Sequence, residues 1–239
     1  MSVSQNVAII GGAGQVALLL TKILASKGRK VISVIRKPEQ ASTIEAVGGK
    51  PVVLSLEESP VDAFAALFGG VNVVVFCAGA SGHRTKAVDH DGAVKVYDAI
   101  ELTANKPRLI VLSAIGDEED KKGEDHAYAV IGEYMKWKYE ADKKLVQRTA
   151  FKWTILRPTW LDDEPATGTG HARIGRTHMT PNVTRYDVAD TLALLVDRPD
   201  AAGLALDLVG VVDGERSPLN TIPVALDTAI RKGETDFEM

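Results

Sequence analysis

The sequence has a single cysteine, no long apolar run and no excess of positive charge, and each absence narrows the classes of protein to consider. Cys77 is the only cysteine in 239 residues, so no intramolecular disulfide can form, which fits a reducing compartment. No apolar run reaches the roughly 18 residues that a membrane helix needs. Residues 1–6 lack the basic and apolar segments of a secretory signal. We therefore expect a cytoplasmic protein.

The charge balance is slightly acidic. Acidic residues outnumber basic ones by 32 to 28, which gives a formal net charge of −4. A chain without a broad basic field is not expected to bind nucleic acid or an acidic membrane. The five histidines show none of the spacings of common metal motifs, so no metal site is predicted. We expect a small-molecule substrate, and nothing in the sequence marks an oligomer interface.

Short apolar runs alternate with longer amphipathic segments along the first two thirds of the chain. Apolar runs without polar alternation are typical of buried strands, and strands that alternate with helices indicate a parallel sheet covered on both faces. The sequence therefore predicts an α/β fold, a doubly wound parallel sheet of Rossmann type. The expected strands lie at 6–10, 31–35, 50–54, 71–76, 109–112 and 153–156, and the expected helices at 14–27, 60–68, 92–104 and 127–149.

The pattern weakens after Pro158. Residues 159–182 are rich in glycine and proline, and we predict an irregular segment with a short strand near 172–177 that forms a pocket wall or lid. A helix at 187–197, a strand at 204–209 and a terminal helix near 218–232 are expected to follow. We interpret residues 1–239 as one domain, with a cofactor-binding core at 1–158 and a small C-terminal substrate-side region with closing elements at 159–239.

A glycine-rich loop joins the first expected strand to the first expected helix. It consists of Gly11, Gly12, Ala13, Gly14, Gln15, Val16 and Ala17. A helix N-terminus offers unpaired N–H groups and a positive dipole, which suit a diphosphate. Gly11 permits the tight turn, Gly14 lets a phosphate approach the backbone, and Ala17 lets helix and strand pack closely. In this strand–loop–helix context the loop predicts dinucleotide binding, although a tight turn without a ligand is the alternative.

The end of the second expected strand indicates which dinucleotide binds. An NAD site usually has an acidic residue there, whereas this chain has Arg36 and Lys37. Arg36 can bind a 2′-phosphate through its forked guanidinium and Lys37 adds positive charge, so we predict NADP(H). The alternative is that both are solvated loop residues.

Several stretches together resemble the atypical short-chain dehydrogenase/reductases, in particular their NAD(P)H-binding, NmrA-like branch. The resemblance covers nearly the whole chain. It is carried by Gly-Gly-Ala-Gly-Gln-Val-Ala at 11–17, Val-Ile-Arg-Lys at 34–37, Phe-Cys-Ala-Gly-Ala at 76–80, Val-Asp-His-Asp-Gly-Ala at 88–93, Ile-Val-Leu-Ser at 110–113, Thr-Ile-Leu-Arg-Pro at 154–158 and Tyr-Asp-Val-Ala at 186–189.

The resemblance implies positions for several site residues. Ala78 and Gly79 would flank the adenine ribose, Ser113 would lie near the nicotinamide or substrate, and Pro158 and Thr159 would close over the nicotinamide. The family often has Asp-Leu after the third strand, where this chain has Ser-Leu at 55–56. Leu56 stays a candidate contact, and the departure concerns adenine binding rather than phosphate binding.

Short-chain reductases use a Tyr-x-x-x-Lys pair, in which the phenol gives a proton to a carbonyl and the ammonium lowers the phenol pKa from about 10. The sequence has two such pairs, Tyr134/Lys138 and Tyr139/Lys143. Tyr134 and Lys138 share a helical stripe with Ala141 and Leu145, so we choose this pair, with Ser113 orienting the carbonyl. Two alternatives remain: Tyr134 packs its ring while Lys138 snorkels, or Lys138 binds ribose and Tyr134 is silent.

These features favour an NADP(H)-dependent oxidoreductase acting on a small carbonyl or quinone-like acceptor. A non-catalytic NADP(H)-binding redox sensor or regulatory protein is the alternative, and a reductase whose proton comes from solvent is a third. We interpret Cys77 as a small buried residue rather than a nucleophile. The acids at 162–164 are interpreted as a solvated turn, and His171 and His178 in the expected lid could contact substrate.

Overall fold

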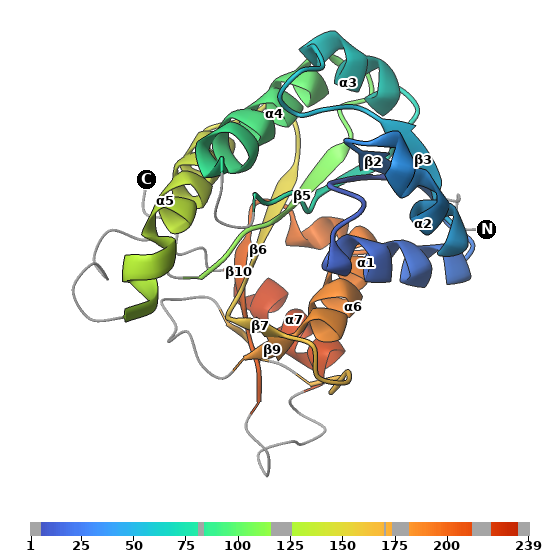
Figure 1. Ribbon diagram of the computed structural model, residues 1–239. Helices are drawn as coiled ribbons and strands as arrows, with labels where there is room; N and C mark the ends of the chain where they lie inside the picture. The colour runs from blue at the N-terminus through green and yellow to red at the C-terminus, as the bar shows by residue number, and fades with distance from the viewer. Residues whose placement is uncertain are drawn as a thin grey trace.

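The computed structural model of the chain describes residues 6–80, 84–115, 126–169, 171–173, 182–211 and 221–233. Its centre is an eight-stranded sheet in the order β3-β2-β1-β4-β5-β6-β10-β8 (Figure 1). The neighbouring strands pair in parallel, except that β8 runs antiparallel to β10. The strands are β1 (Asn6–Ile10), β2 (Lys30–Ile35), β3 (Lys50–Val53), β4 (Val73–Phe76), β5 (Arg108–Leu112), β6 (Trp153–Pro158), β8 (His171–Arg173) and β10 (Ala205–Val209).

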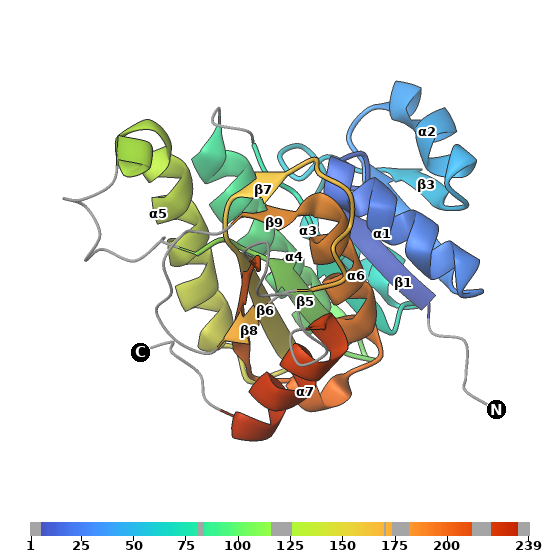
Figure 2. The same ribbon diagram turned by 90° about the horizontal axis from the view of Figure 1, so that it is seen from below.

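Helices cover both faces of this sheet (Figures 1 and 2). On one face lie α1 (Gln15–Ser26), α6 (Arg185–Val196) and α7 (Ile222–Lys232), and on the other α3 (Val61–Phe68), α4 (Gly92–Leu102) and α5 (His126–Val146). The short α2 (Ala41–Ala46) packs beside β3, and a π-helical turn at Lys86–Asp91 leads directly into α4. This is a Rossmann-type fold, as the sequence predicts.

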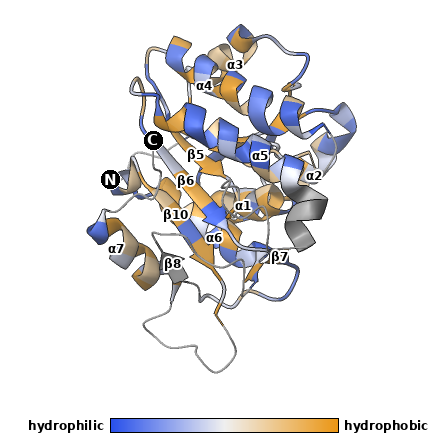
Figure 3. Cartoon of the chain, turned by 90° about the vertical axis from the view of Figure 1, so that its left-hand side faces the viewer, coloured by the Kyte–Doolittle hydropathy of each residue, from blue (hydrophilic) through white to orange (hydrophobic). Residues whose placement is uncertain are grey.

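The apolar pattern explains why the layers form. Leu20 and Leu24, one helical turn apart on α1, are fully buried against the sheet, together with Val7 and Ile9 of β1. Burying a leucine side chain contributes about 1.5–3 kcal/mol, so the inward stripes of the helices account for much of the stabilisation. Figure 3 shows the apolar strands enclosed by helices whose hydrophilic residues face outward.

Most expected elements are confirmed with small shifts at their ends. In the described part of 159–182, β7 (Leu161–Asp162) pairs in parallel with β9 (Val183–Thr184), a pairing that the sequence did not predict. The short strand expected near 172–177 is β8, and it covers the outer edge of β10, where unpaired backbone groups would otherwise face solvent. Residue 170 and residues 174–181, which complete the expected lid and include His178, lie outside the described residues.

Elements that follow residue 158 join the same sheet and core. Strand β10 pairs with β6, and α6 packs against α1 at the other end of the sequence. Among the residues that the structure describes, no helix combines the length and apolar character that a membrane span requires.

Candidate functional site

The glycine loop between β1 and α1 makes the close backbone contacts expected of a phosphate-binding turn. Gly11 has φ of +79°, and a Cβ atom there would lie 2.6 Å from Cα of Ala78 at the end of β4. The amide of Gly14 donates to the carbonyl of Gly11 at 3.0 Å and closes the turn. Gly12 has a role that the sequence did not indicate, because its Cβ would lie 2.6 Å from Cβ of Ser33. Two glycines thus hold the loop against neighbouring strands.

The N-terminus of α1 is open to an anion. Gly14 is the N-cap residue with φ of −70°, no side chain caps the first turn, and that turn holds no acidic residue. Gln15 is exposed at the start of the helix, Val16 is buried, and Ala17 is fully buried, where a larger side chain would push helix and strand apart. Backbone amides and the helix dipole therefore face the loop without an internal partner of opposite charge.

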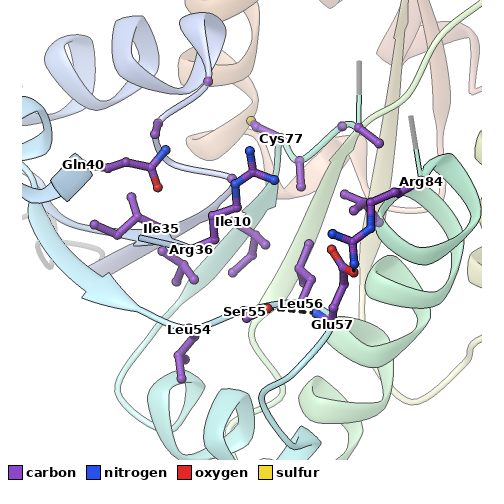
Figure 4. Close-up of a pocket in the computed structure, with 18 residues that line it drawn as sticks. Ile10, Ile35, Arg36, Gln40, Leu54, Ser55, Leu56, Glu57, Cys77 and Arg84 are labelled. Carbon is purple, nitrogen blue, oxygen red and sulfur yellow. Dashed lines mark hydrogen bonds and ion pairs between the residues drawn. The ribbon is translucent and has the colours of Figure 1, made fainter. Parts of the chain in front are cut away.

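A pocket of about 410 Å³ opens beside this loop at the carboxyl ends of β1, β2, β3 and β4 (Figure 4). Its volume lies in the range of about 300–1,000 Å³ of small-molecule sites. Six of the predicted cofactor contacts line it: Gly11, Gly14, Arg36, Leu56, Ala78 and Gly79. The other predicted contacts are not among its lining residues: Gln15, Val16, Lys37, Ser113, Lys138, Pro158 and Thr159.

Two arginines reach the pocket from opposite sides (Figure 4). Arg36 extends from the end of β2, is exposed, and makes no ion pair with a side chain that the structure describes. Arg84, which precedes the π-helical turn, forms an ion pair with Glu57 of the opposite wall. Lys37 is exposed, and its backbone N–H donates to the side chain of Gln40 at 3.1 Å.

Hydrogen bonds that the sequence did not indicate hold the loop after β3. Oγ of Ser55 accepts hydrogen bonds from the amides of Glu57 and Glu58, so serine performs the local capping role open to the family's aspartate. Nζ of Lys95 on α4 donates to the carbonyls of Leu56 at 2.5 Å and Ser59 at 2.9 Å. Lys95, absent from the sequence prediction, thus fixes the wall that carries Leu56.

A second group of polar side chains gathers beyond the ends of β4 and β5. Nζ of Lys138 donates to the carbonyl of Leu112 at 3.2 Å and lies 5.4 Å from the ring centre of Tyr134, so the predicted pair is in contact. Oγ of Ser113 donates to Oδ2 of Asp142 at 2.5 Å. Ser113, Lys138 and Asp142 are buried, and Tyr134 is half-buried.

Asp89 links this group to the pocket beside the glycine loop. Its Oδ1 lies 3.4 Å from Nζ of Lys138, and its Oδ2 accepts from the amide of Ala80 at 3.2 Å. A Cβ at Gly79 would lie 3.5 Å from the same carboxylate. Since Gly79 and Ala80 line the pocket, one buried carboxylate touches both halves of the candidate site.

Burial and charge shift the pKa values of this group in opposite ways. Burial by itself would lower the pKa of Lys138, but Tyr134 and the carboxylates of Asp89 and Asp142 raise it above its usual range. Burial raises the pKa of Asp89, although Lys138 opposes that effect. Burial also raises the pKa of Asp142 to about 6, against the opposing influence of Ser113 and Lys138. The Lys138 ammonium therefore stays charged at neutral pH, whereas the Asp142 carboxyl titrates about one pH unit below neutrality.

Helix α5 explains why the first Tyr-x-x-x-Lys pair faces inward and the second does not. Met135, Lys138, Ala141 and Leu145 form its buried stripe, with Tyr134 at the margin. In the second pair the side chain of Lys143 is 40% exposed and forms an ion pair with Glu140. The local geometry agrees with the choice of Tyr134 and Lys138, while their chemical roles stay predictions.

The carboxyl end of β6 holds two further predicted residues. Pro158 and Thr159 are buried, and their backbones join neighbouring segments, with Ile115 N–H donating to the Pro158 carbonyl and Thr159 N–H donating to the carbonyl of Leu208. Next to them Nε of Arg157 donates to Oδ1 of Asp207 at 2.6 Å in a buried ion pair. Pro158 and Thr159 therefore lie at the carboxyl end of β6, next to the carboxyl end of β5, which Ser113 follows.

Several other residues are placed by the structure. Cys77 lines the pocket and is half-buried rather than buried as predicted. Desolvation raises the pKa of its thiol to about 12, so the thiol stays protonated at neutral pH. Within the described ranges, no three His, Cys, Asp or Glu side chains are arranged to hold a metal ion. The side chain of His171 lies outside the described residues.

Two residues of this group could have been found from the sequence. Asp142 follows Lys138 by four residues, so it shares the inward face of the helix, and a carboxylate there needs a partner. Asp89 stands in the stretch 88–93 that carries part of the family resemblance. Neither spacing could show that both carboxylates meet the same lysine, because they come from different elements.

Comparison with known proteins agrees with this geometry. A model of a family described as NAD(P)H-binding matches residues 11–199. A Schizosaccharomyces pombe protein of the UPF0659 group is 34% identical over 96% of both chains. The Bacillus subtilis protein named as an uncharacterised sugar epimerase, YhfK, is 30% identical over 85% of this chain and 93% of its own.

Two solved structures share the fold over nearly their whole length. The oxidoreductase YlbE from Lactococcus lactis superposes with a TM-score of 0.82 and 25% identity, covering 95% of this chain and 97% of its own. A Bacillus halodurans protein named as an NAD-dependent epimerase/dehydratase gives 0.80 and 28%, with 93% and 99% covered.

Fold, glycine loop and pocket together define a Rossmann-type nicotinamide-dinucleotide-binding domain of the epimerase/dehydratase-like superfamily. The chain belongs to the NAD(P)H-binding family. Among its similar structures is an oxidoreductase.

Proposed function

We propose that the chain is an NADP(H)-dependent oxidoreductase of the atypical short-chain type, acting on a small carbonyl or quinone-like acceptor. The observation that carries this proposal is the contact between Lys138 and Tyr134 beside Ser113, with Asp89 joining them to the pocket. A phenol next to a buried ammonium is suited to proton transfer, and its position next to a dinucleotide pocket suits a reductase.

The pocket fits the proposed cofactor. Gly11 and Gly14, with the open N-terminus of α1, would hold the diphosphate, and Ala78 and Gly79 would flank the adenine ribose. Arg36 would bind the 2′-phosphate, since no acidic residue stands at the end of β2 to accept ribose hydroxyls. A bound nicotinamide would supply or accept the hydride.

The chain's own residues would handle the proton. Tyr134 would donate it to the carbonyl oxygen, and the charged Lys138 would favour the phenolate that results. Lys138 would also bind the ribose, and Ser113 would orient the acceptor. Pro158 and Thr159 would close the nicotinamide side of the site.

Turnover of cofactor tests this proposal directly. NADPH oxidation is followed with a panel of quinones, aldehydes and flavins, and NADPH binding is titrated separately. Tyr134→Phe should lower kcat by about 100-fold or more, the usual contribution of a general acid, while NADPH binding stays unchanged. Tyr139→Phe, the same change five residues further along the helix in the second pair, should leave both quantities unaltered.

Other outcomes favour other functions. Tight NADPH binding without turnover of any acceptor would favour a redox sensor, and turnover indifferent to Tyr134→Phe would mean that solvent supplies the proton. A second candidate follows from the Bacillus subtilis relative, which is named as a sugar epimerase. Epimerisation would convert a sugar without net NADPH oxidation, so product analysis with sugar nucleotides separates it from reduction.

A further inference from the structure

The Ser113 hydroxyl has one hydrogen, and when Asp142 is ionised its carboxylate is the acceptor of that hydrogen. Oγ of Ser113 donates to Oδ2 of Asp142 at 2.5 Å, and both side chains are buried. A hydroxyl has one donor and two acceptor lone pairs, and an ionised carboxylate only accepts. In this arrangement Ser113 can accept a hydrogen bond from a ligand hydroxyl but cannot donate one to a carbonyl.

We propose that Asp142 is a positioning residue whose protonation state decides whether Ser113 donates or accepts a hydrogen bond in the substrate site. When the Asp142 carboxyl is protonated, it donates to Oγ of Ser113, and the serine hydrogen is then available to a carbonyl acceptor. When Asp142 is ionised, Ser113 presents only lone pairs, which suit the alcohol product. Asp142 gains or loses no proton during turnover; it selects the oxidation state of the ligand that Ser113 favours.

The surroundings of Asp142 bring its pKa close to neutral pH. It is 1% exposed, and burial raises its pKa to about 6. The hydrogen bond from Ser113 and the positive charges of Lys138 on α5 and Arg157 on β6 oppose the rise. Arg157 is already paired with Asp207 of β10 at 2.6 Å, so only part of its charge favours an ionised Asp142.

Three further titratable groups lie around Lys138 and Asp142. Asp89, from the π-helical turn, lies 3.4 Å from Nζ of Lys138, so one ammonium serves two buried carboxylates. Tyr97 of α4, fully buried, also faces Asp142, and the thiol of Cys77 at the end of β4 faces Lys138. Because burial penalises each ionised carboxylate and Lys138 is shared, protonation of Asp142 near neutral pH is chemically accessible.

The inference rests on the proposed function for its catalytic consequence but not for its first test. Difference infrared spectra of the full chain without cofactor, recorded between pH 5 and pH 8, report the C=O stretch of a protonated carboxyl. The band should titrate near pH 6, disappear in Asp142→Asn, persist in Asp89→Asn, and shift in Ser113→Ala. No band, a band lost in Asp89→Asn instead, or a band unchanged by Ser113→Ala would overturn the proposal.

The pH profile of reduction provides the second test. With saturating NADPH, kcat for carbonyl reduction should fall above about pH 6 through one ionisation. Asp142→Asn should abolish that step, because its amide N–H donates to Ser113 at every pH. Glu133→Gln makes the same carboxylate-to-amide change at an exposed position of the same helix and should keep the wild-type profile.

The two tests separate the inference from the proposed function. If the infrared band behaves as expected but no acceptor is reduced, the oxidoreductase proposal fails and the Asp142–Ser113 arrangement stands. If Tyr134-dependent reduction occurs without the band, or with the step near pH 6 still present in Asp142→Asn, the arrangement fails and the function stands.

Discussion

Arg36 is expected to set the preference between NADPH and NADH, which differ by the 2′-phosphate. Its side chain lines the pocket at the end of β2, is exposed, and makes no ion pair with a described side chain. The guanidinium can therefore turn to a ligand without breaking an existing ion pair. Its fork matches the geometry of a phosphate group, which an ammonium does not.

The magnitude follows from the bonds that would be lost. A hydrogen bond to a charged group contributes about 1.5–3 kcal/mol, and 1.4 kcal/mol corresponds to about tenfold in affinity. Arg36→Ala should therefore weaken NADPH binding by about 10- to 100-fold. NADH binding should change by no more than about twofold, as for a surface substitution. Because Arg36 is exposed, the loss should shrink at high salt.

Calorimetric titration of each variant with both dinucleotides measures this effect, and thermal unfolding checks that the fold is retained. Lys37→Ala removes the same charge from the neighbouring residue, which does not line the pocket, and should cost less NADPH affinity. Arg36→Lys should give an intermediate loss, since it keeps the charge and loses the fork. Equal losses for NADPH and NADH, or no loss for NADPH, would refute the 2′-phosphate role.

Three further experiments test the glycine loop, the Cys77 thiol and the charge of Lys138. Gly11→Ala introduces a Cβ 2.6 Å from a backbone atom at φ +79°, so urea unfolding should show a loss of about 1–3 kcal/mol. Gly14→Ala, at φ −70° with its Cβ 3.3 Å from the carbonyl oxygen of Gly11, should cost less stability than Gly11→Ala and should weaken dinucleotide binding in titrations. Because desolvation raises the pKa of the Cys77 thiol to about 12, the thiol is protonated at pH 8, although the side chain is only half-buried. Mass spectrometry after iodoacetamide treatment should therefore show slower alkylation in the native than in the unfolded chain, and equal rates would contradict the raised pKa. Lys138→Met leaves two buried carboxylates without their shared cation, so the free energy of unfolding at pH 8 should fall by about 3–5 kcal/mol. The loss should be smaller at pH 5, because the raised pKa of Asp142 lets this carboxylate take up a proton there. A loss that does not change with pH would argue against the coupling between Lys138 and Asp142.

Features that depend on adjacent residues were predictable from the sequence. The strand–glycine–helix segment at 6–26 and Arg36 after the second strand are local, because a tight turn needs glycine and a strand end is next to its own loop. The inward stripe with Tyr134 and Lys138 follows from helical periodicity. These features were sufficient to place a dinucleotide pocket at the carboxyl ends of the first strands.

The sequence by itself therefore determined the order of strands and helices, the phosphate loop and the side of the sheet where ligands bind, because periodicity and turn chemistry act over a few residues. Only the tertiary structure decided that β8 runs antiparallel at the sheet edge and that Gly12 packs on Ser33. It also brought Asp89 to Lys138, the lysine that Asp142 neighbours on α5. Such contacts join segments tens of residues apart, and burial, which sets the pKa values of those carboxylates, arises only when the layers pack around them.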